Sequence, residues 1–312
     1  MDSRHYSWLW LRRCALVIAL GTATLLSEAV AQTRQQTGEE AKARAVQGDP
    51  TAQYEYGHFQ LVHNATPEGI ASGLKFLRAS AAQNYAKAEF YLGWLYEHGG
   101  PVRVDYTLAL ENYKAAAAQH NGAAENNLAS MYEKGQGVRK NLKTAWQWYL
   151  AGAQDGDAWA QANLASIYYK GRGTKRNYEE TVRWLRASAN NGLPEGENNL
   201  AYFYFYGIGV ATDYNEAARL LRAAAENLPA AQTNLAYLYE QGKGVPLDYV
   251  AAHTWYSRAI AAGDTTGSER LKQLEQIMTQ KQLDEARGVM TAKTREATKG
   301  LAQGGAFSLV GH

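Results

Sequence analysis

Two short motifs contain the residues that could support nucleophilic catalysis. Ser72 and Lys75 form an S-x-x-K pattern, and Ser188 to Asn190 form an S-x-N pattern. In serine enzymes that react with penicillin-type substrates, such patterns occur together with a K-T-G segment, and the lysine or a neighbouring base activates the serine hydroxyl. This chain contains no K-T-G segment, and the periodicity around both motifs indicates packed helices. We therefore predict no catalytic residue.

Metal and cofactor sites have equally weak support in the sequence. No two histidines have the spacing of metal ligands on one helix face, and H-E-x-x-H, phosphate-loop and Rossmann patterns are absent. Cys14 is the only cysteine. We predict no metal site and no cofactor. The seven histidines are His5, His58, His63, His98, His120, His253 and His312.

Charge and composition narrow the classes of partner. Of the 312 residues, 46% are hydrophobic and 20% are charged, as in an ordinary globular protein. The net charge is only +2, whereas nucleic-acid-binding proteins usually concentrate a basic excess on one face. We therefore predict no nucleic-acid partner.

The amino-terminal segment has the order of features of a secretory signal peptide. A basic start precedes the apolar run Cys14 to Leu26, and the small-residue site Ala29 to Ala31 follows. We predict a Sec-type signal peptide over residues 1–31, and a bacterial protein that is periplasmic or secreted. An uncleaved membrane anchor is the alternative, although the run is short for a bilayer span. After cleavage we expect no stable membrane insertion and no cysteine, hence no disulfide. The basic start contains Arg4, Arg12 and Arg13.

An internal repeat is the strongest signal in the chain. A bulky residue followed by a small one recurs at spacings of 36, 36, 36, 36 and 35 residues. A tyrosine usually follows this anchor after four residues, a glycine after seven, and Asp or Asn after thirteen. The anchors are Tyr56, Leu92, Leu128, Leu164, Leu200 and Leu235.

These spacings predict a helix, a glycine turn and a second helix in each unit. Leu128 and Tyr132 are four residues apart and share a helix face. Gly135, like Gly171, Gly207 and Gly242, follows where a left-handed residue would end the helix. Asp213 with Glu216, and Asn177 with Glu180, have capping-box spacing for the second helix. One hairpin cannot bury its apolar face alone, so the units must stack.

The segment Leu235 to Gly263 resembles a Sel1-like repeat, which is related to the tetratricopeptide repeat. The resemblance implies an all-α, right-handed solenoid of about six helical hairpins over residues 48–263, with a capping helix pair at the carboxyl end. The predicted units are residues 48–83, 84–119, 120–155, 156–191, 192–227 and 228–263.

The ends of the array depart from this pattern. In the first unit the stretch Val62 to Gly69 replaces the glycine turn, so we expect a longer connection there. We predict a leader and the start of the first helix at residues 32–47, and capping helices at residues 264–292. Thr279 and Gln282 have capping-box spacing within the latter segment. A mobile tail is expected at residues 293–312.

In tetratricopeptide arrays the first helices line a concave groove, and the same offsets can be applied to this resemblance. They select the partner-binding residues Trp94, Trp159, Tyr169, Tyr202, Phe205, Tyr206 and Tyr237. Aromatic residues exposed in this way are typical of interaction surfaces. The alternative is that several are half-buried contacts between neighbouring first helices. The asparagines before four anchors, such as Asn163, are better explained as partners of buried carbonyl groups.

The function that the resemblance implies is a non-catalytic exported scaffold that binds a protein or peptide in its groove. A β-lactamase-like or peptidoglycan-active enzyme is one alternative. A groove that binds an envelope glycan is another, since aromatic rings also stack on sugars.

Overall fold

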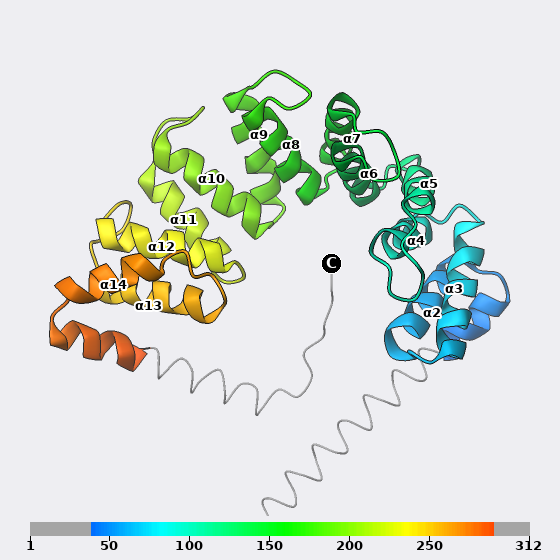
Figure 1. Cartoon of the computed structure of the whole chain (residues 1–312), viewed down its shortest axis with the longest axis horizontal. Helices are drawn as coiled ribbons and strands as arrows, with labels where there is room; N and C mark the ends of the chain where they lie inside the picture. The colour runs from blue at the N-terminus through cyan, green and yellow to red at the C-terminus, as the bar shows by residue number, and fades with distance from the viewer. Residues whose placement is uncertain (1–38, 290–312) are drawn as a thin grey trace, which may run out of the picture. The chain divides into compact units, whose positions relative to one another are not determined.

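The computed structural model describes residues 39–289, and that range contains helices and no β-strand. The chain divides into two compact units, one ending at Ala88 and the other beginning at Glu89, which we describe separately. Figure 1 shows the helices of each unit following one another in chain order. The all-α fold class is thereby confirmed. The predicted signal peptide and carboxyl-terminal tail lie outside the described residues.

The first unit contains a helix at residues 39–46, followed by α2 (Pro50–His63) and α3 (Pro67–Ala81). Helices α2 and α3 approach closely through Gly57 and Gly73. A Cβ atom on either glycine would lie 2.9 Å from the carbonyl oxygen of the other. The expected long connection from Val62 to Gly69 is wrong. Helix α2 continues to His63, and Thr66 caps α3 by accepting a hydrogen bond from the Gly69 N–H at 3.1 Å.

The second unit is a series of helical hairpins followed by a closing pair. Its first helix, α4 (Ala86–His98), begins at the boundary between the units. The hairpins are α4 with α5 (Tyr106–Ala117), α6 (Gly122–Lys134) with α7 (Leu142–Gln154), α8 (Ala158–Lys170) with α9 (Tyr178–Asn190), α10 (Pro194–Tyr206) with α11 (Tyr214–Ala224), and α12 (Pro229–Gln241) with α13 (Tyr249–Ala261). The closing pair is α14 (Ser268–Ile277) and a helix at residues 280–289.

The glycines seven residues after the anchors end the first helices as predicted. Gly135, Gly171, Gly207 and Gly242 have left-handed conformations with φ between 63° and 78°. The second glycine of the turn has a different role, because it lies against the preceding hairpin. A Cβ atom on Gly137 would lie 2.5 Å from the main-chain oxygen of Tyr106, the first residue of α5.

Asp or Asn caps each second helix of the second unit through its side chain, but the predicted capping boxes are only half formed. Asp213 accepts hydrogen bonds from the Asn215 and Glu216 N–H groups. The return bond is missing, because the Asp213 N–H donates to the Tyr204 carbonyl at 3.0 Å and Glu216 pairs with Arg219. The same main-chain bond recurs in every hairpin from α4–α5 to α12–α13 and connects its two helices.

The core of the second unit lies between the two layers of helices. The anchor residues Leu128, Leu164 and Leu235 are fully buried, and the small residues beside them allow close helix approach. Neighbouring first helices also contact one another, as α6 does α8, α8 does α10 and α10 does α12. No neighbouring second helices of this unit contact each other to a similar extent. The first helices therefore form a continuous face on which side chains of successive hairpins meet.

The closing pair is joined by the capping box predicted from sequence. The Thr279 N–H donates to Gln282 Oε1 at 2.9 Å, and the Gln282 N–H donates to Thr279 Oγ1 at 3.3 Å. Across residues 39–289, no helix combines the length and apolar character that crossing a membrane requires.

Candidate functional site

Three hairpins of the second unit share a buried pair that joins the second helix to the first. A buried tyrosine hydroxyl donates a hydrogen bond to a glutamate five residues after the anchor. The pairs are Tyr113 with Glu97 at 2.7 Å, Tyr149 with Glu133 at 3.1 Å, and Tyr256 with Glu240 at 2.7 Å. Burial, and then the negative charge of Glu97, raise the pKa of Tyr113, so this hydroxyl remains a donor. These hairpins therefore place a carboxylate on the face of the first helices.

The hairpins α8–α9 and α10–α11 replace both members of this pair. The tyrosine becomes Leu185 or Leu221, each at most 4% exposed, and the glutamate becomes Tyr169 or Phe205. Neither leucine can donate a hydrogen bond, so a carboxylate opposite it would lose its buried partner. The two exchanges together make this part of the face aromatic rather than acidic.

Two hollows open on this aromatic part of the face, and a replacement leucine lines each of them. The larger has a volume of about 360 Å³ and lies between α8, α9 and α10, with Leu185 and Tyr169 in its wall. The smaller has about 80 Å³ and lies between α10, α11 and α12, with Leu221 and Tyr237 in its wall. Tyr202 lines both hollows and separates them.

The rings of this region form a connected series. We call Tyr169, Tyr202, Phe205, Tyr206 and Tyr237 the aromatic surface. Tyr202 and Tyr206 have ring centroids 4.6 Å apart, Phe205 contacts Tyr206 at 4.8 Å, and Phe205 contacts Tyr237 at 5.9 Å. The buried ring of Phe203 joins the remaining member, because it contacts Tyr169 at 5.4 Å and Tyr202 at 5.8 Å. The offsets used in the sequence analysis did not include Phe203.

Exposure divides the aromatic surface into two groups. Tyr202 is 46% exposed and Tyr206 is 58% exposed. Tyr169, Phe205 and Tyr237 are half-buried, and the first two pack against the main hydrophobic core, as the alternative interpretation expected. Tyr202 and Tyr206 are therefore the residues best placed to contact another molecule.

Cationic side chains border the aromatic surface. Lys243 Nζ lies 4.7 Å from the ring centroid of Phe205, and the Arg270 guanidinium lies 4.4 Å from that of Tyr237. A third hollow, of about 350 Å³, extends from Tyr169 to Lys170, Arg172 and Arg176 in the turn after α8. Two of these cations are paired with carboxylates of the same face, Arg172 with Glu133 at 3.3 Å and Arg270 with Glu240 at 3.1 Å. The site thus combines exposed aromatic rings with a border of cations, some of which are already neutralised.

The other two predicted site residues lie apart from this surface. Trp94, on α4, is 39% exposed and stacks on His98 at 4.8 Å. Trp159, near the start of α8, is 46% exposed and lines none of the three hollows. Of the seven predicted residues, five are brought together and two are not.

Two of the asparagines directly before the anchors donate to an asparagine that lies two residues before the preceding anchor, rather than to the main-chain carbonyls that we expected. Asn163 Nδ2 donates to Asn126 Oδ1 at 2.9 Å, and Asn234 Nδ2 donates to Asn198 Oδ1 at 2.8 Å. Each bond joins the first helices of neighbouring hairpins, because side-chain oxygens at adjacent helix faces come within reach of the amide. These asparagines therefore support the face structurally.

The hydroxyl of the S-x-N motif also has a structural partner. Ser188 is fully buried in α9, and its Oγ donates to the main-chain oxygen of Ala158 at 2.9 Å. Ser80 makes the same contact with the Pro50 oxygen in the first unit. This serine position connects a second helix to the start of its partner helix.

Comparisons with known proteins agree with the repeat architecture. The family model for the Sel1 repeat matches five stretches, residues 86–121, 122–157, 160–193, 194–227 and 229–264. The protective antigen c5321 of uropathogenic Escherichia coli strains, which displays an SLR fold, is similar in structure with a TM-score of 0.70 and 28% identity. That similarity covers 85% of this chain but only 57% of the antigen. A Sel1 repeat protein from Oxalobacter formigenes is similar with a TM-score of 0.62 and 30% identity, over 70% of this chain and 92% of that one. A comparison with curated proteins finds no match.

Proposed function

The chain belongs to the Sel1 repeat family, whose members are generally protein-interaction scaffolds, and from this premise we propose that it is an exported, non-catalytic scaffold that binds a segment of another protein on the aromatic surface. The observation that carries the proposal is the exposure of Tyr202 and Tyr206 beside two hollows. Core packing does not require these rings, because Leu200 and Phe203 already fill the buried positions of α10.

The chemistry of the surface indicates the kind of segment that fits it. An apolar or aromatic side chain would enter the larger hollow, where Leu185 and Tyr202 offer apolar contact. An acidic residue next to it would lie near Lys170 and Arg176, which line the third hollow together with Arg172, itself paired with Glu133. The proposed partner is therefore an extended protein segment with apolar and acidic residues.

Export is proposed from the sequence alone. The basic start, the apolar run Cys14 to Leu26 and the site at Ala29 to Ala31 support it. The proposed location is the periplasm or the exterior of a bacterial cell, where the partner would be an envelope or secreted protein.

The test separates binding from stability with three variants. Capture from an envelope extract should be lost in the double variant Tyr202→Ala/Tyr206→Ala, because hot-spot truncation costs about 2 kcal/mol or more, roughly thirtyfold in affinity. Its Tm should change little, since both rings are largely exposed. Leu200→Ala should instead lower stability by about 2–5 kcal/mol, since Leu200 is 3% exposed. Tyr106→Ala removes a tyrosine that is 37% exposed on α5, and serves as the matched control.

The results for the double variant distinguish the proposed binding surface from the alternatives. Unfolding of the double variant would assign both tyrosines to the core and refute the proposed surface. Unchanged capture by a folded double variant would place the binding site elsewhere. Tyrosine-dependent retention of a purified envelope glycan, without a protein, would favour the carbohydrate-binding alternative.

A further inference from the structure

The repeats supply an internal standard for a polar contact near the start of each first helix. The residue three positions before each anchor is Gln or Glu. The residue twenty-seven positions after the anchor is usually Gln or Asn, whose side chain is an amide. In three repeats the amide donates to this residue. The pairs are Gln83 with Gln53 at 2.8 Å, Gln119 with Glu89 at 2.6 Å, and Asn191 with Gln161 at 3.0 Å.

The third repeat departs from this standard because both positions carry carboxylates. Glu125 is 3% exposed in α6, and Asp155, just after α7, replaces the amide. The Asp155 side chain has no N–H group to donate. Glu125 Oε2 is buried and accepts no hydrogen bond from any residue in the range 39–289. The neutral Oε1 of Gln232, at the equivalent position of the sixth repeat, is also buried without a hydrogen-bond partner, but a buried carboxylate oxygen additionally needs a proton or a cation beside it.

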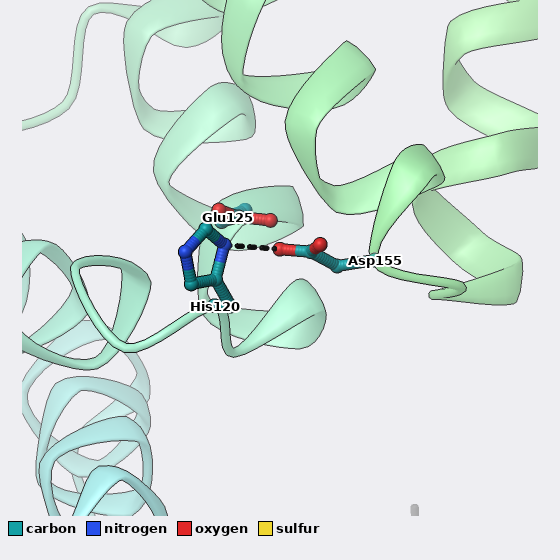
Figure 2. Close-up of side chains that lie close together, drawn as sticks. All are labelled: His120, Glu125 and Asp155. Atoms are coloured by element: carbon teal, nitrogen blue, oxygen red, sulfur yellow. Dashed lines mark hydrogen bonds and ion pairs between the residues drawn. The ribbon is translucent and has the colours of Figure 1, made fainter.

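A histidine, His120, also lies beside these two carboxylates, at a position where most other repeats carry glycine. His120 precedes α6 and has φ of 58°, a left-handed conformation that Gly48, Gly156 and Gly192 adopt at the equivalent positions and that Asn84 adopts in the first repeat, with φ of 57°. Such a conformation is uncommon for a histidine and recurs at functional sites. The His120 ring turns toward the carboxylates, and its Nδ1 lies 3.1 Å from Asp155 Oδ2 (Figure 2).

The three side chains therefore converge on one point from three segments of chain. One ligand atom from each of His120, Glu125 and Asp155 lies within 4.8 Å of the others. Burial, and then the negative charge of Asp155, raise the pKa of Glu125 to about 7, while the charge of Asp157 acts in the same direction and His120 opposes it. Asp157 is already engaged, since its Oδ1 accepts the Ala160 N–H at 2.6 Å as the cap of α8.

The donor set selects the class of ion. One imidazole nitrogen with two carboxylate oxygens suits Zn²⁺ and similar divalent transition metals, which take three or four such ligands. Ca²⁺ and Mg²⁺ prefer sites made only of oxygen, with six or more ligands, and a histidine does not serve them. The His120 side chain is 83% exposed, so solvent has access to the remaining coordination positions.

We propose that His120, Glu125 and Asp155 bind a divalent transition-metal ion, with Zn²⁺ as the ion that fits best. The ion would connect the turn after α5 to α6 and to the end of α7. It would thereby join the second repeat to the third, and within the third repeat it would replace the amide contact that three other repeats make.

The test uses the full chain after chelator treatment and dialysis. Titration with ZnCl₂ in a calorimeter should show one site, and Co²⁺ should give the visible absorption of a bound ion. The matched variants His120→Gly and Asp155→Asn restore residues that other repeats carry at these positions, so both should fold. Each should weaken Zn²⁺ binding at least tenfold, because each removes a ligand. MgCl₂ and CaCl₂ should not raise the Tm of the wild-type protein.

Two results would overturn the proposal. The first is absence of Zn²⁺ binding in the wild-type protein, with a Tm that depends on pH but not on the metal. That outcome would mean that the two carboxyl groups share a proton only. The second is equal Zn²⁺ affinity in the wild-type protein and both variants, which would place the bound ion elsewhere, for example at His253 and Glu275, which lie 3.0 Å apart.

Discussion

The two glycines of one turn should respond very differently to the same substitution. Gly135 and Gly137 both have positive φ, of 78° and 65°, so alanine at either position incurs the cost of a left-handed residue, about 1 kcal/mol. A Cβ atom on Gly135 would lie 3.2 Å from the Cβ atom and 3.3 Å from the main-chain nitrogen of Lys140, close contacts that a small shift of the turn relieves. A Cβ atom on Gly137 would lie 2.5 Å from the main-chain oxygen of Tyr106, which cannot move without moving α5.

The steric difference sets the expected magnitudes. Gly135→Ala should lower the free energy of unfolding by about 1 kcal/mol. Gly137→Ala should add an overpacking cost of about 1–3 kcal/mol, because the third hairpin must separate from the second. Gly156→Ala is the control for the backbone term alone, because Gly156 has φ of 89° and no atom within 4 Å of an added Cβ.

Urea unfolding followed by circular dichroism measures these differences on the full chain. The order of stability should be wild type, then Gly156→Ala and Gly135→Ala together, then Gly137→Ala. Equal losses for Gly135→Ala and Gly137→Ala would refute the close approach of the turn to α5. A neutral result for all three would refute the left-handed conformations themselves.

In chelator-containing buffer, the stability of the wild-type protein should fall as pH rises from about 4.5 to 7.5. The raised pKa of Glu125 means that its stabilising contribution is complete below the pKa of the unfolded chain and is lost as pH passes through about 7. Glu125→Gln should remove most of this slope, and a flat wild-type profile in urea titrations at several pH values would contradict the assignment. Protein recovered from the cell envelope should begin at Gln32, and an intact amino terminus there would contradict signal cleavage.

Sequence periodicity was sufficient to predict the hairpins because each element depends on local chemistry. The left-handed conformation of Gly171 and the side-chain cap from Asn177 follow from residue type and spacing alone. The return half of the Asn177 box did not form, because the Asn177 N–H instead donates to the Tyr168 carbonyl nine residues earlier. That competing acceptor becomes available only once the turn has folded.

The candidate site was predictable only where repeat phase determines position. Tyr202 and Tyr206 share a helix face by spacing, and the structure exposes both. Trp159 has a suitable phase but lies too near the start of α8 to reach the others. The role of Leu185 was not evident from the sequence. This leucine stands where other hairpins have a tyrosine that donates a hydrogen bond to a glutamate. The exchange of tyrosine for leucine is visible in the sequence only when equivalent positions of the repeats are compared.

The convergence of His120 with Glu125 and Asp155 was missed for a similar reason. Local spacing reveals histidine pairs on one helix, whereas these three side chains come from a turn, a helix and the residue after another helix. Their separation in sequence gives no local pattern. The sequence does contain one signal: His120 and Asp155 both differ from the residues that most other repeats carry at the same positions.

The tyrosine–glutamate pair has a consequence for how such arrays diversify. Exchanging Tyr113 for leucine alone would leave Glu97, whose side chain is 10% exposed, without its donor. Exchanging Glu97 for an aromatic residue alone would set a second large ring against a tyrosine that is already fully buried. We therefore expect each single exchange to lower stability, whereas the two exchanges occur together in Tyr169 with Leu185. The first hairpin carries Leu61 and Leu77 at these two positions, so an apolar pair offers an intermediate between the acidic and the aromatic combination.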